Sequence, residues 1–244
     1  MWAIQPGAAD MRRSLPAANP FAYTQKVQAL APIAYWPLAE SSGSVATDES
    51  GNARNGAYTS VALGAAGIGD GRSAATFDGS TSYCNVQGAG LTAAFSGAAG
   101  TLALWAKVSA AGVWTDGVTR LLAIFLVDAS NFVRLRKIST ANTLDAQYSA
   151  GGTIKTVQIS TSTTGYFHLA ATWNKAGDQF IVYFNGAQSG STQTGLGTFA
   201  GSLATSLIGA NSTAPANVHS GVEAHVALWA SALSAAQIAT LAVP

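Results

Sequence analysis

Charged side chains are scarce in this chain of 244 residues. Lys, Arg, Asp and Glu make up 9% of it, against roughly a quarter in an average soluble domain, while hydrophobic residues make up 48%. The 12 basic and 11 acidic residues nearly cancel, so the sequence lacks the basic surface that nucleic-acid binding requires. We therefore expect no nucleic-acid partner and a surface made largely of small and hydroxyl side chains.

Three further absences narrow the class of protein. The single cysteine, Cys84, excludes an internal disulfide framework. No apolar run approaches the roughly 18 residues of a membrane helix, so we expect no insertion into a membrane. Residues 1–16 lack the basic-then-apolar order of a secretory signal peptide. We therefore expect synthesis in the cytoplasm without export by that route.

Residues 1–20 are predicted to form an extended N-terminal arm. Pro6, Pro16 and Pro20 block any regular element longer than a turn or two. Because such a segment cannot pair its own backbone groups, we expect it to become ordered by laying side chains on another subunit. The residues assigned to this assembly arm are Trp2, Ile4, Arg12, Arg13 and Leu15.

From residue 33 onward, short runs of alternating apolar and polar residues are separated by Gly, Asn, Asp and Ser. This pattern predicts an all-β fold, a two-sheet antiparallel β-sandwich formed by residues 21–244 as one domain. The predicted strands cover residues 34–38, 73–77, 82–87, 101–108, 119–127, 131–138, 144–149, 154–159, 166–173, 179–184, 206–209 and 222–230.

Two short helices are predicted beside the strands. The first covers residues 24–30 with Thr24 as its N-cap. The second follows Ser234, which forms a capping box with Gln237. In the strand at residues 101–108, Leu102 and Leu104 share the core face, and the opposite face is expected to be half exposed. Trp36, Trp105 and Trp173 lie in strands with apolar neighbours and are expected to be buried.

Six runs in order resemble the laminin-G-like branch of the concanavalin A-like lectin and glucanase superfamily. Examples are AATFDGSTSYCNV, TLALWAKV and the closing VALWASALSAAQIATL. The resemblance covers about residues 22–244 and implies a jelly-roll sandwich. The run HVALWASALSAAQI at residues 225–238 resembles modules of this kind in bacteriophage virion proteins as well as in bacterial surface proteins, and the lack of a signal-peptide pattern favours the phage class. The six runs are residues 22–59, 74–86, 101–108, 165–174, 180–186 and 226–241.

No catalytic residue is assigned. Glucanases on this sandwich share an acidic strand motif, Glu-x-Asp-x-x-Glu, which places a nucleophile and an acid roughly 5 Å apart. The only glutamates here are Glu40, Glu49 and Glu223, and none has an aspartate two residues later. The three histidines also lack the spacing of a zinc site. We therefore expect a protein that is not an enzyme.

Calcium is the one cofactor that the resemblance suggests. Relatives often hold it in loops at one edge of the sandwich, and Asp48 and Asn52 in the run DESGN supply the matching side-chain oxygens. However, the acidic position of the last strand falls on Ala224, with Glu223 pointing to the opposite face. The loop is therefore interpreted either as a calcium site or as an Asx turn without metal.

Trp114 is the predicted glycan-binding residue, because it is the most conspicuous aromatic in a loop. Arg134 and Arg136 place two guanidinium groups on one strand face, which we interpret as a solvated face or a contact with a neighbouring subunit.

These features favour a structural or decoration subunit of a large assembly. A bacteriophage virion is the first candidate, with other virion proteins, copies of the chain and cell-surface glycans as partners. The alternative is a carbohydrate-binding adhesin or lectin module of a bacterial surface protein.

Overall fold

The structure, a computed structural model, describes Asn19 and residues 21–244. The arm assignments Trp2, Ile4, Arg12, Arg13 and Leu15 lie outside the described residues.

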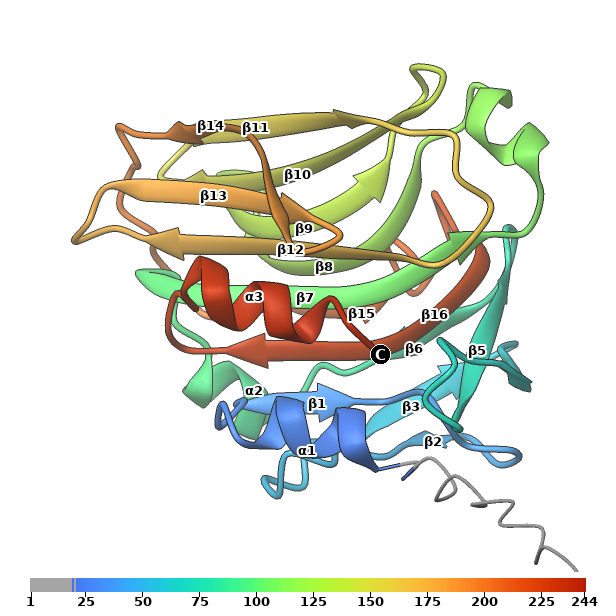
Figure 1. Cartoon of the computed structure of the whole chain (residues 1–244). Coiled ribbons are helices and arrows are strands. Elements are labelled where there is room, and N and C mark those ends of the chain that lie inside the picture. The colour runs from blue at the N-terminus through green and yellow to red at the C-terminus, as the bar shows by residue number, and fades with distance from the viewer. Residues whose placement is uncertain (1–18, 20) are drawn as a thin grey trace, which may run out of the picture.

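Two antiparallel eight-stranded sheets pack face to face, as predicted (Figure 1). Sheet A has the order β14-β13-β12-β7-β16-β5-β4, with β1 also paired to β16. Its strands are β1 (Ala34–Trp36), β4 (Ala62–Ala66), β5 (Ser73–Asp78), β7 (Ala99–Val108), β12 (Phe167–Asn174), β13 (Gln179–Phe184), β14 (Ala187–Gln193) and β16 (Ser220–Trp229).

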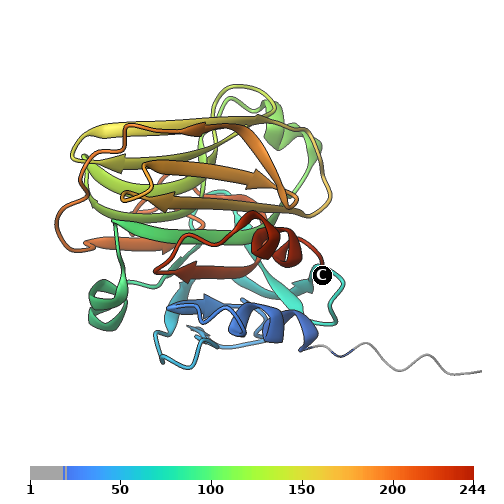
Figure 2. The same ribbon diagram turned by 60° about the vertical axis from the view of Figure 1, so that its left-hand side comes forward.

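Sheet B has the order β11-β10-β9-β8-β15-β6-β3-β2. Figure 2 shows the two sheets as stacked layers, with the described N-terminal segment at their lower edge. The strands of sheet B are β2 (Val45–Ala46), β3 (Gly56–Thr59), β6 (Tyr83–Asn85), β8 (Arg120–Asp128), β9 (Asn131–Lys137), β10 (Thr143–Ala150), β11 (Thr153–Ser160) and β15 (Thr205–Ile208).

The helices are short. They are α1 (Ala22–Gln28), α2 (Ala89–Ala94), the 3₁₀ turn η1 (Ala111–Thr115) and α3 (Ala235–Leu241). No helix in the described part of the chain is long and apolar enough to cross a membrane.

All twelve predicted strands are present within a few residues of their expected bounds. Strands β2, β3, β4 and β14 were not predicted from the sequence. These strands consist mostly of Ala, Gly, Ser and Thr, whose intrinsic preference for strands is weak apart from Thr. They form at the margins of the sheets, where pairing with a neighbour decides the conformation.

The main core lies between the two sheets. Trp36 and Trp173 are fully buried in it, together with the core face of β7. The expected burial of both tryptophans is therefore confirmed. Trp105, at 6% exposure, is buried as well, but on the other face of sheet A.

The expectation that this second face of β7 would be half exposed is wrong for most of its length. Helices α1 and α3 lie across the outer face of sheet A (Figure 1). They cover a second apolar cluster that contains Trp105, Trp229 and Tyr23. Tyr23 joins the layers, because its hydroxyl accepts a bond from Trp105 Nε1 at 2.8 Å and donates to the Leu241 carbonyl at 2.8 Å.

The prediction that Thr24 is the N-cap of the first helix is also wrong, whereas the predicted N-cap of the last helix, Ser234, is confirmed. Helix α1 begins at Ala22, and the backbone N–H of Phe21 donates to the side chain of Asn19 at 3.0 Å. Thr24 instead lies inside the helix, where its hydroxyl contacts Tyr35 and Arg72. At α3, Ser234 and Gln237 form the predicted capping box.

Glu223 lies in the core between the sheets. It pairs with Ala106 and Ala75, both core-facing, whereas Ala224 faces the outer cluster. The side chain is fully buried, and neither carboxyl oxygen has a hydrogen-bond partner among the residues that the structure describes. Burial raises the pKa of Glu223 well above its ordinary value of 4.5, so the group is held as the neutral acid.

This burial predicts that the contribution of Glu223 to stability falls with rising pH. Above pH 4.5 the unfolded chain releases the Glu223 proton while the folded chain keeps it, so the free energy of unfolding falls by about 1.4 kcal/mol per pH unit up to the folded pKa. The free energy of unfolding of the wild type minus that of Glu223→Gln, from urea denaturation, should therefore fall steadily between pH 5 and 8. The buried histidines, whose lowered pKa acts in the opposite direction below pH 6.5, contribute equally to both chains. Asp128→Asn is the matched control, because the pKa of Asp128 is lowered and its titration lies below this range. An unchanged slope in Glu223→Gln would contradict the buried neutral acid.

Candidate functional site

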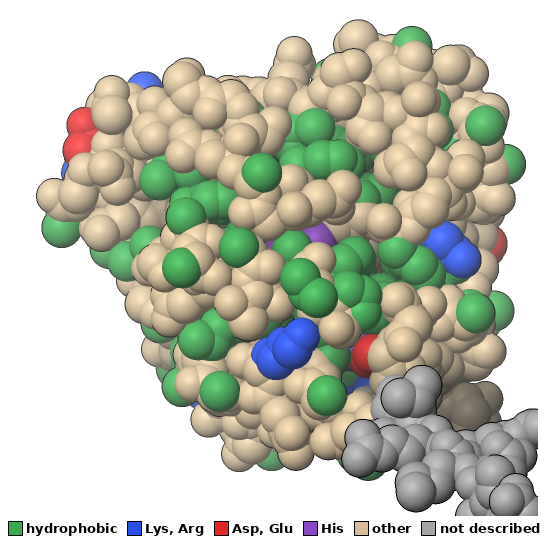
Figure 3. Space-filling view, viewed as in Figure 1, with side chains coloured by type: hydrophobic (Ala, Val, Ile, Leu, Met, Phe, Trp, Pro, Cys, Tyr) green, Lys and Arg blue, Asp and Glu red, His purple; other side chains and the backbone are tan. Residues whose placement is uncertain are grey.

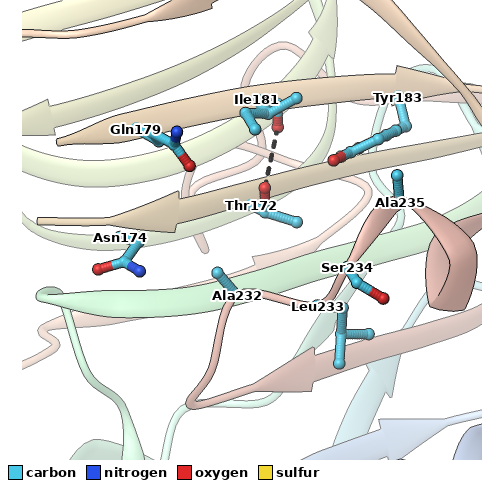
Figure 4. Close-up of a pocket in the computed structure, with 9 residues that line it drawn as sticks. All are labelled: Thr172, Asn174, Gln179, Ile181, Tyr183, Ala232, Leu233, Ser234 and Ala235. Atoms are coloured by element: carbon cyan, nitrogen blue, oxygen red, sulfur yellow. Dashed lines mark hydrogen bonds between the residues drawn. The ribbon is translucent and has the colours of Figure 1, made fainter. Parts of the chain in front are cut away.

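A cavity of about 280 Å³ opens on the outer face of sheet A, beside the start of α3. Strands β12 and β13 form one wall, and the connection from β16 to α3 forms the other (Figure 4). Its lining residues are Thr172, Asn174, Gln179, Ile181, Tyr183, Ala232, Leu233, Ser234 and Ala235.

The cavity has a buried floor and a polar rim. Thr172, Tyr183 and Leu233 are buried, whereas Gln179 and Ser234 are exposed. Figure 4 shows Gln179 beside Asn174 at one end of the cavity, and Tyr183 and Ser234 toward the other. Strand alternation explains this placement, because side chains two residues apart on β12 and on β13 share the outer face.

The lining carries no charged side chain. In the described part of the chain, the Gln179 side-chain amide makes no hydrogen bond, whereas Ser234 is engaged in the cap of α3. Burial raises the pKa of Tyr183, so its hydroxyl stays protonated at neutral pH. The cavity therefore offers uncharged amide groups at its rim above a buried floor, which suits a neutral ligand rich in hydroxyl groups.

The face that carries this cavity is poor in charge. Figure 3 shows it covered by hydrophobic and uncharged polar atoms, with acidic and basic side chains as isolated spots and a histidine in a hollow near the centre. Two smaller cavities lie elsewhere. One of about 270 Å³ is bordered by Asn52, Arg54 and α2, and one of about 180 Å³ by Asn85, Gln87 and Thr205.

The predicted glycan platform, Trp114, is not part of the cavity. It lies in η1 and is 1% exposed. Its ring packs against Phe167, and Nε1 donates to the Thr163 carbonyl at 2.8 Å. Since neither face of the ring is free for a sugar, the assignment of Trp114 to glycan binding is corrected. A loop position did not predict exposure here because the loop folds back onto the sandwich.

The structure brings Asp48 and Asn52 into one loop, but their groups are already bonded. Asp48 is 7% exposed. Its Oδ1 accepts the backbone N–H groups of Tyr35 and Ser50 at 2.9 Å, and its Oδ2 accepts that of Arg54 at 2.8 Å. The Asn52 amide donates to the carbonyls of Pro32 and Ile33.

This arrangement does not fit calcium. The ion takes six to eight oxygen ligands, whereas the Asp48 oxygens already accept three N–H donors, and the Arg54 guanidinium occupies the Ile33 carbonyl. Within residues 21–244, no group of three or more His, Cys, Asp or Glu side chains is placed to hold a metal ion. Of the two interpretations left open by the sequence, the geometry favours the Asx turn.

Nearly all the described carboxylates are committed to structural partners. Only Asp10 of the 11 acidic residues precedes the described segment. Glu223 is sealed in the core, and the others accept hydrogen bonds from backbone, hydroxyl, amide, imidazole or cationic groups. These others are Glu40, Asp48, Glu49, Asp70, Asp78, Asp116, Asp128, Asp145 and Asp178.

Comparison with known families agrees with this architecture. Residues 78–239 match the family model of the concanavalin A-like lectin/glucanases superfamily. The chain belongs to this superfamily. No curated protein matches its sequence.

Solved structures that resemble this concanavalin A-like sandwich include both binding domains and an enzyme. Domain 4 of AbnA, a GH43 extracellular arabinanase from Geobacillus stearothermophilus solved with arabinotriose, aligns with a TM-score of 0.63 and 17% identity over 86% of this chain and 98% of that one. The binding domain of botulinum neurotoxin serotype D aligns with a TM-score of 0.62 and 14% identity, over 87% of this chain and 51% of the toxin chain. Trypanosoma rangeli sialidase in complex with the inhibitor DANA aligns with a TM-score of 0.60 and 14% identity, over 86% of this chain and 32% of the sialidase chain. At these identities the likeness establishes the fold alone.

The Asp48 loop yields a stability prediction. Asp48→Ala leaves three backbone donors without their acceptor and should lower the free energy of unfolding by roughly 2–4 kcal/mol. Asn52→Ala, in the same loop, should cost less, because Asn52 is exposed. Thermal unfolding of the intact chain should be the same with millimolar calcium as with a chelator. A melting temperature that rises with calcium concentration would restore the metal interpretation.

Proposed function

We propose that this chain is a non-catalytic, glycan-contacting subunit of a large assembly, and that the assembly is a bacteriophage virion. The observation that supports the absence of catalysis in this proposal is that the described carboxyl groups are either bonded to structural partners or buried. Glycoside hydrolysis needs two acidic groups that face the substrate. Of the ten acids within residues 21–244, nine are held by structural partners and Glu223 is sealed between the sheets.

The uncharged cavity supports contact with a glycan. Sugar hydroxyls are matched by amide and hydroxyl groups. Gln179 presents an exposed amide at one end of the cavity, with Asn174 beside it, while the buried ring of Tyr183 forms part of the floor. The arabinanase domain of the same fold was solved with arabinotriose, which makes short neutral oligosaccharides the first ligands to test.

Composition supports the assembly role. With only 9% charged residues, much of the surface can lose its water on binding a neighbouring subunit at a low cost in free energy. The proline-rich residues 1–20 lead directly into α1, which is fixed on sheet A. We infer that this segment clasps other virion proteins or further copies of the chain. A lectin or adhesin module of a bacterial surface protein is the second candidate, and the same cavity favours it.

Glycan contact at the cavity is testable by calorimetry against a panel of neutral oligosaccharides that includes arabinotriose. Gln179→Ala should weaken binding about five- to tenfold, which corresponds to one hydrogen bond. Gln188→Ala is the matched control, because Gln188 is an exposed glutamine on the adjacent strand β14, outside the cavity. Reducing ends should not accumulate during prolonged incubation. Release of reducing ends would overturn the non-catalytic assignment, and equal loss in both variants would overturn the cavity as the site.

The assembly role is tested by deleting residues 1–20. The truncated chain should keep the melting temperature of the intact one, because the sandwich and its three apolar clusters are built from residues 21–244. Its incorporation into the parent particle, measured by complementation of a phage that lacks the chain, should fall sharply. Normal incorporation, or unfolding of the isolated truncated chain, would remove the support for an assembly arm.

A further inference from the structure

The outer face of sheet B carries a guanidinium group that is fixed in place but has no acidic partner. Arg134 lies on β9, on the face opposite the main core, and pairs across the sheet with Gln147 on β10. Its Nε and one terminal nitrogen donate to Gln147 Oε1 at 2.9 and 2.6 Å. Gln147 in turn donates to Thr156 Oγ1 on β11 at 3.1 Å. Three strands therefore hold this side chain in one orientation.

Stacking fixes the plane of the same group. The guanidinium carbon of Arg134 lies 4.4 Å from the centre of the Phe132 ring. Two of the five N–H donors of an arginine are used by Gln147, and the other three make no hydrogen bond within the described part of the chain. Arg134 is half-buried. The edge formed by its two terminal nitrogens is thus pre-organised and unused.

The charge around Arg134 is not balanced by the sheet. Its neighbour Arg136 pairs with Asp145 through two contacts of 2.7 and 2.9 Å, so these two charges cancel. Arg134 has only the neutral Gln147 as a partner. Burial lowers its pKa to about 10, which still leaves the group protonated at neutral pH. One positive charge therefore remains on this face.

We propose that Arg134 anchors a second ligand site, for the carboxylate of an acidic sugar residue. The free edge of a guanidinium matches a planar carboxylate with two parallel hydrogen bonds, which an ammonium group cannot reproduce. Thr156, on the next strand but one, supplies a hydroxyl beside the site for a sugar hydroxyl. The inference rests on the proposed glycan contact and adds that one recognised glycan carries a uronic or similar acid. This site is separate from the uncharged cavity on sheet A.

The test compares trigalacturonate with neutral oligosaccharides on the intact chain. Trigalacturonate should bind the wild-type chain with an affinity that falls as salt rises, and Arg134→Gln should weaken that binding by about tenfold or more. Arg134→Lys keeps the charge without the paired donors and should recover only part of the affinity. Arg54→Gln removes one positive charge from a different surface and should change the affinity less than about twofold.

Neutral ligands separate the two proposals. Arg134→Gln should bind any neutral oligosaccharide of the sheet A cavity as the wild type does, which also shows that the variant is folded. If trigalacturonate binds Arg134→Gln as tightly as wild type, or if Arg54→Gln loses as much, the Arg134 site is refuted while the cavity stands. If no sugar of either kind binds the wild-type chain, the proposed glycan contact itself fails.

Discussion

The central strands of sheet A are buried on both faces, and much of the molecule follows from this constraint. On β7, Leu104 faces sheet B and Trp105 faces the helices, and both are nearly inaccessible to water. A strand in this position can carry few charged side chains, because burial of an unpaired charge is expensive. The scarcity of charge in the sequence is therefore partly a requirement of this architecture, in which a helical layer covers one sheet.

A chain of hydrogen bonds fixes that helical layer to the sheet. Arg72 donates to Thr24 Oγ1 at 2.7 Å, and the Thr24 and Tyr35 hydroxyls lie 3.2 Å apart. The Tyr35 hydroxyl lies 2.6 Å from His225 Nδ1, and His225 Nε2 faces Asp70 at 3.0 Å. Because Arg72 can only donate, the neutral His225 tautomer with its proton on Nε2 lets the Thr24 and Tyr35 hydroxyls each act once as donor and once as acceptor, and turns the ring N–H toward Asp70. Burial lowers the pKa of His225, in agreement with a neutral ring.

The backbone at His225 makes this chain of bonds possible. His225 has a φ of 53° and lies where the register of β16 against β7 shifts. A bulge of this kind re-aims a side chain that strand alternation would place elsewhere. Alternation alone gives His225 the parity of Glu223 and hence the core side, so the sequence could not have predicted its contact with Asp70. Nothing in the sequence VEAHVALW indicates that the strand has a bulge at this position.

Predictability was high where side chains have a strong intrinsic preference and low where tertiary contacts decide. Strands rich in Val, Ile, Leu and aromatic residues were predicted from alternation, but β14, with the sequence AQSGSTQ, was not. The cavity was missed for a different reason. Gln179 and Ser234 are 55 positions apart in sequence and meet only because α3 folds back across β12 and β13. The prediction for Trp114 was wrong because a loop position was taken to indicate an exposed ring, whereas the ring is buried against Phe167.

The small number of charged groups is also the basis of the proposal that this chain binds a glycan and does not hydrolyse it. Each described carboxylate outside the core terminates a turn, holds a hydroxyl or imidazole, or neutralises a cation, as Asp145 does for Arg136. Glycoside hydrolysis by any two of these groups would require their release and joint exposure, at the cost of the loops that they stabilise. Binding requires no such release. Gln179 is exposed with its amide unpaired, and Arg134 already has three unused donors. The groups that the described fold leaves unpaired are therefore those that the proposed glycan contact uses.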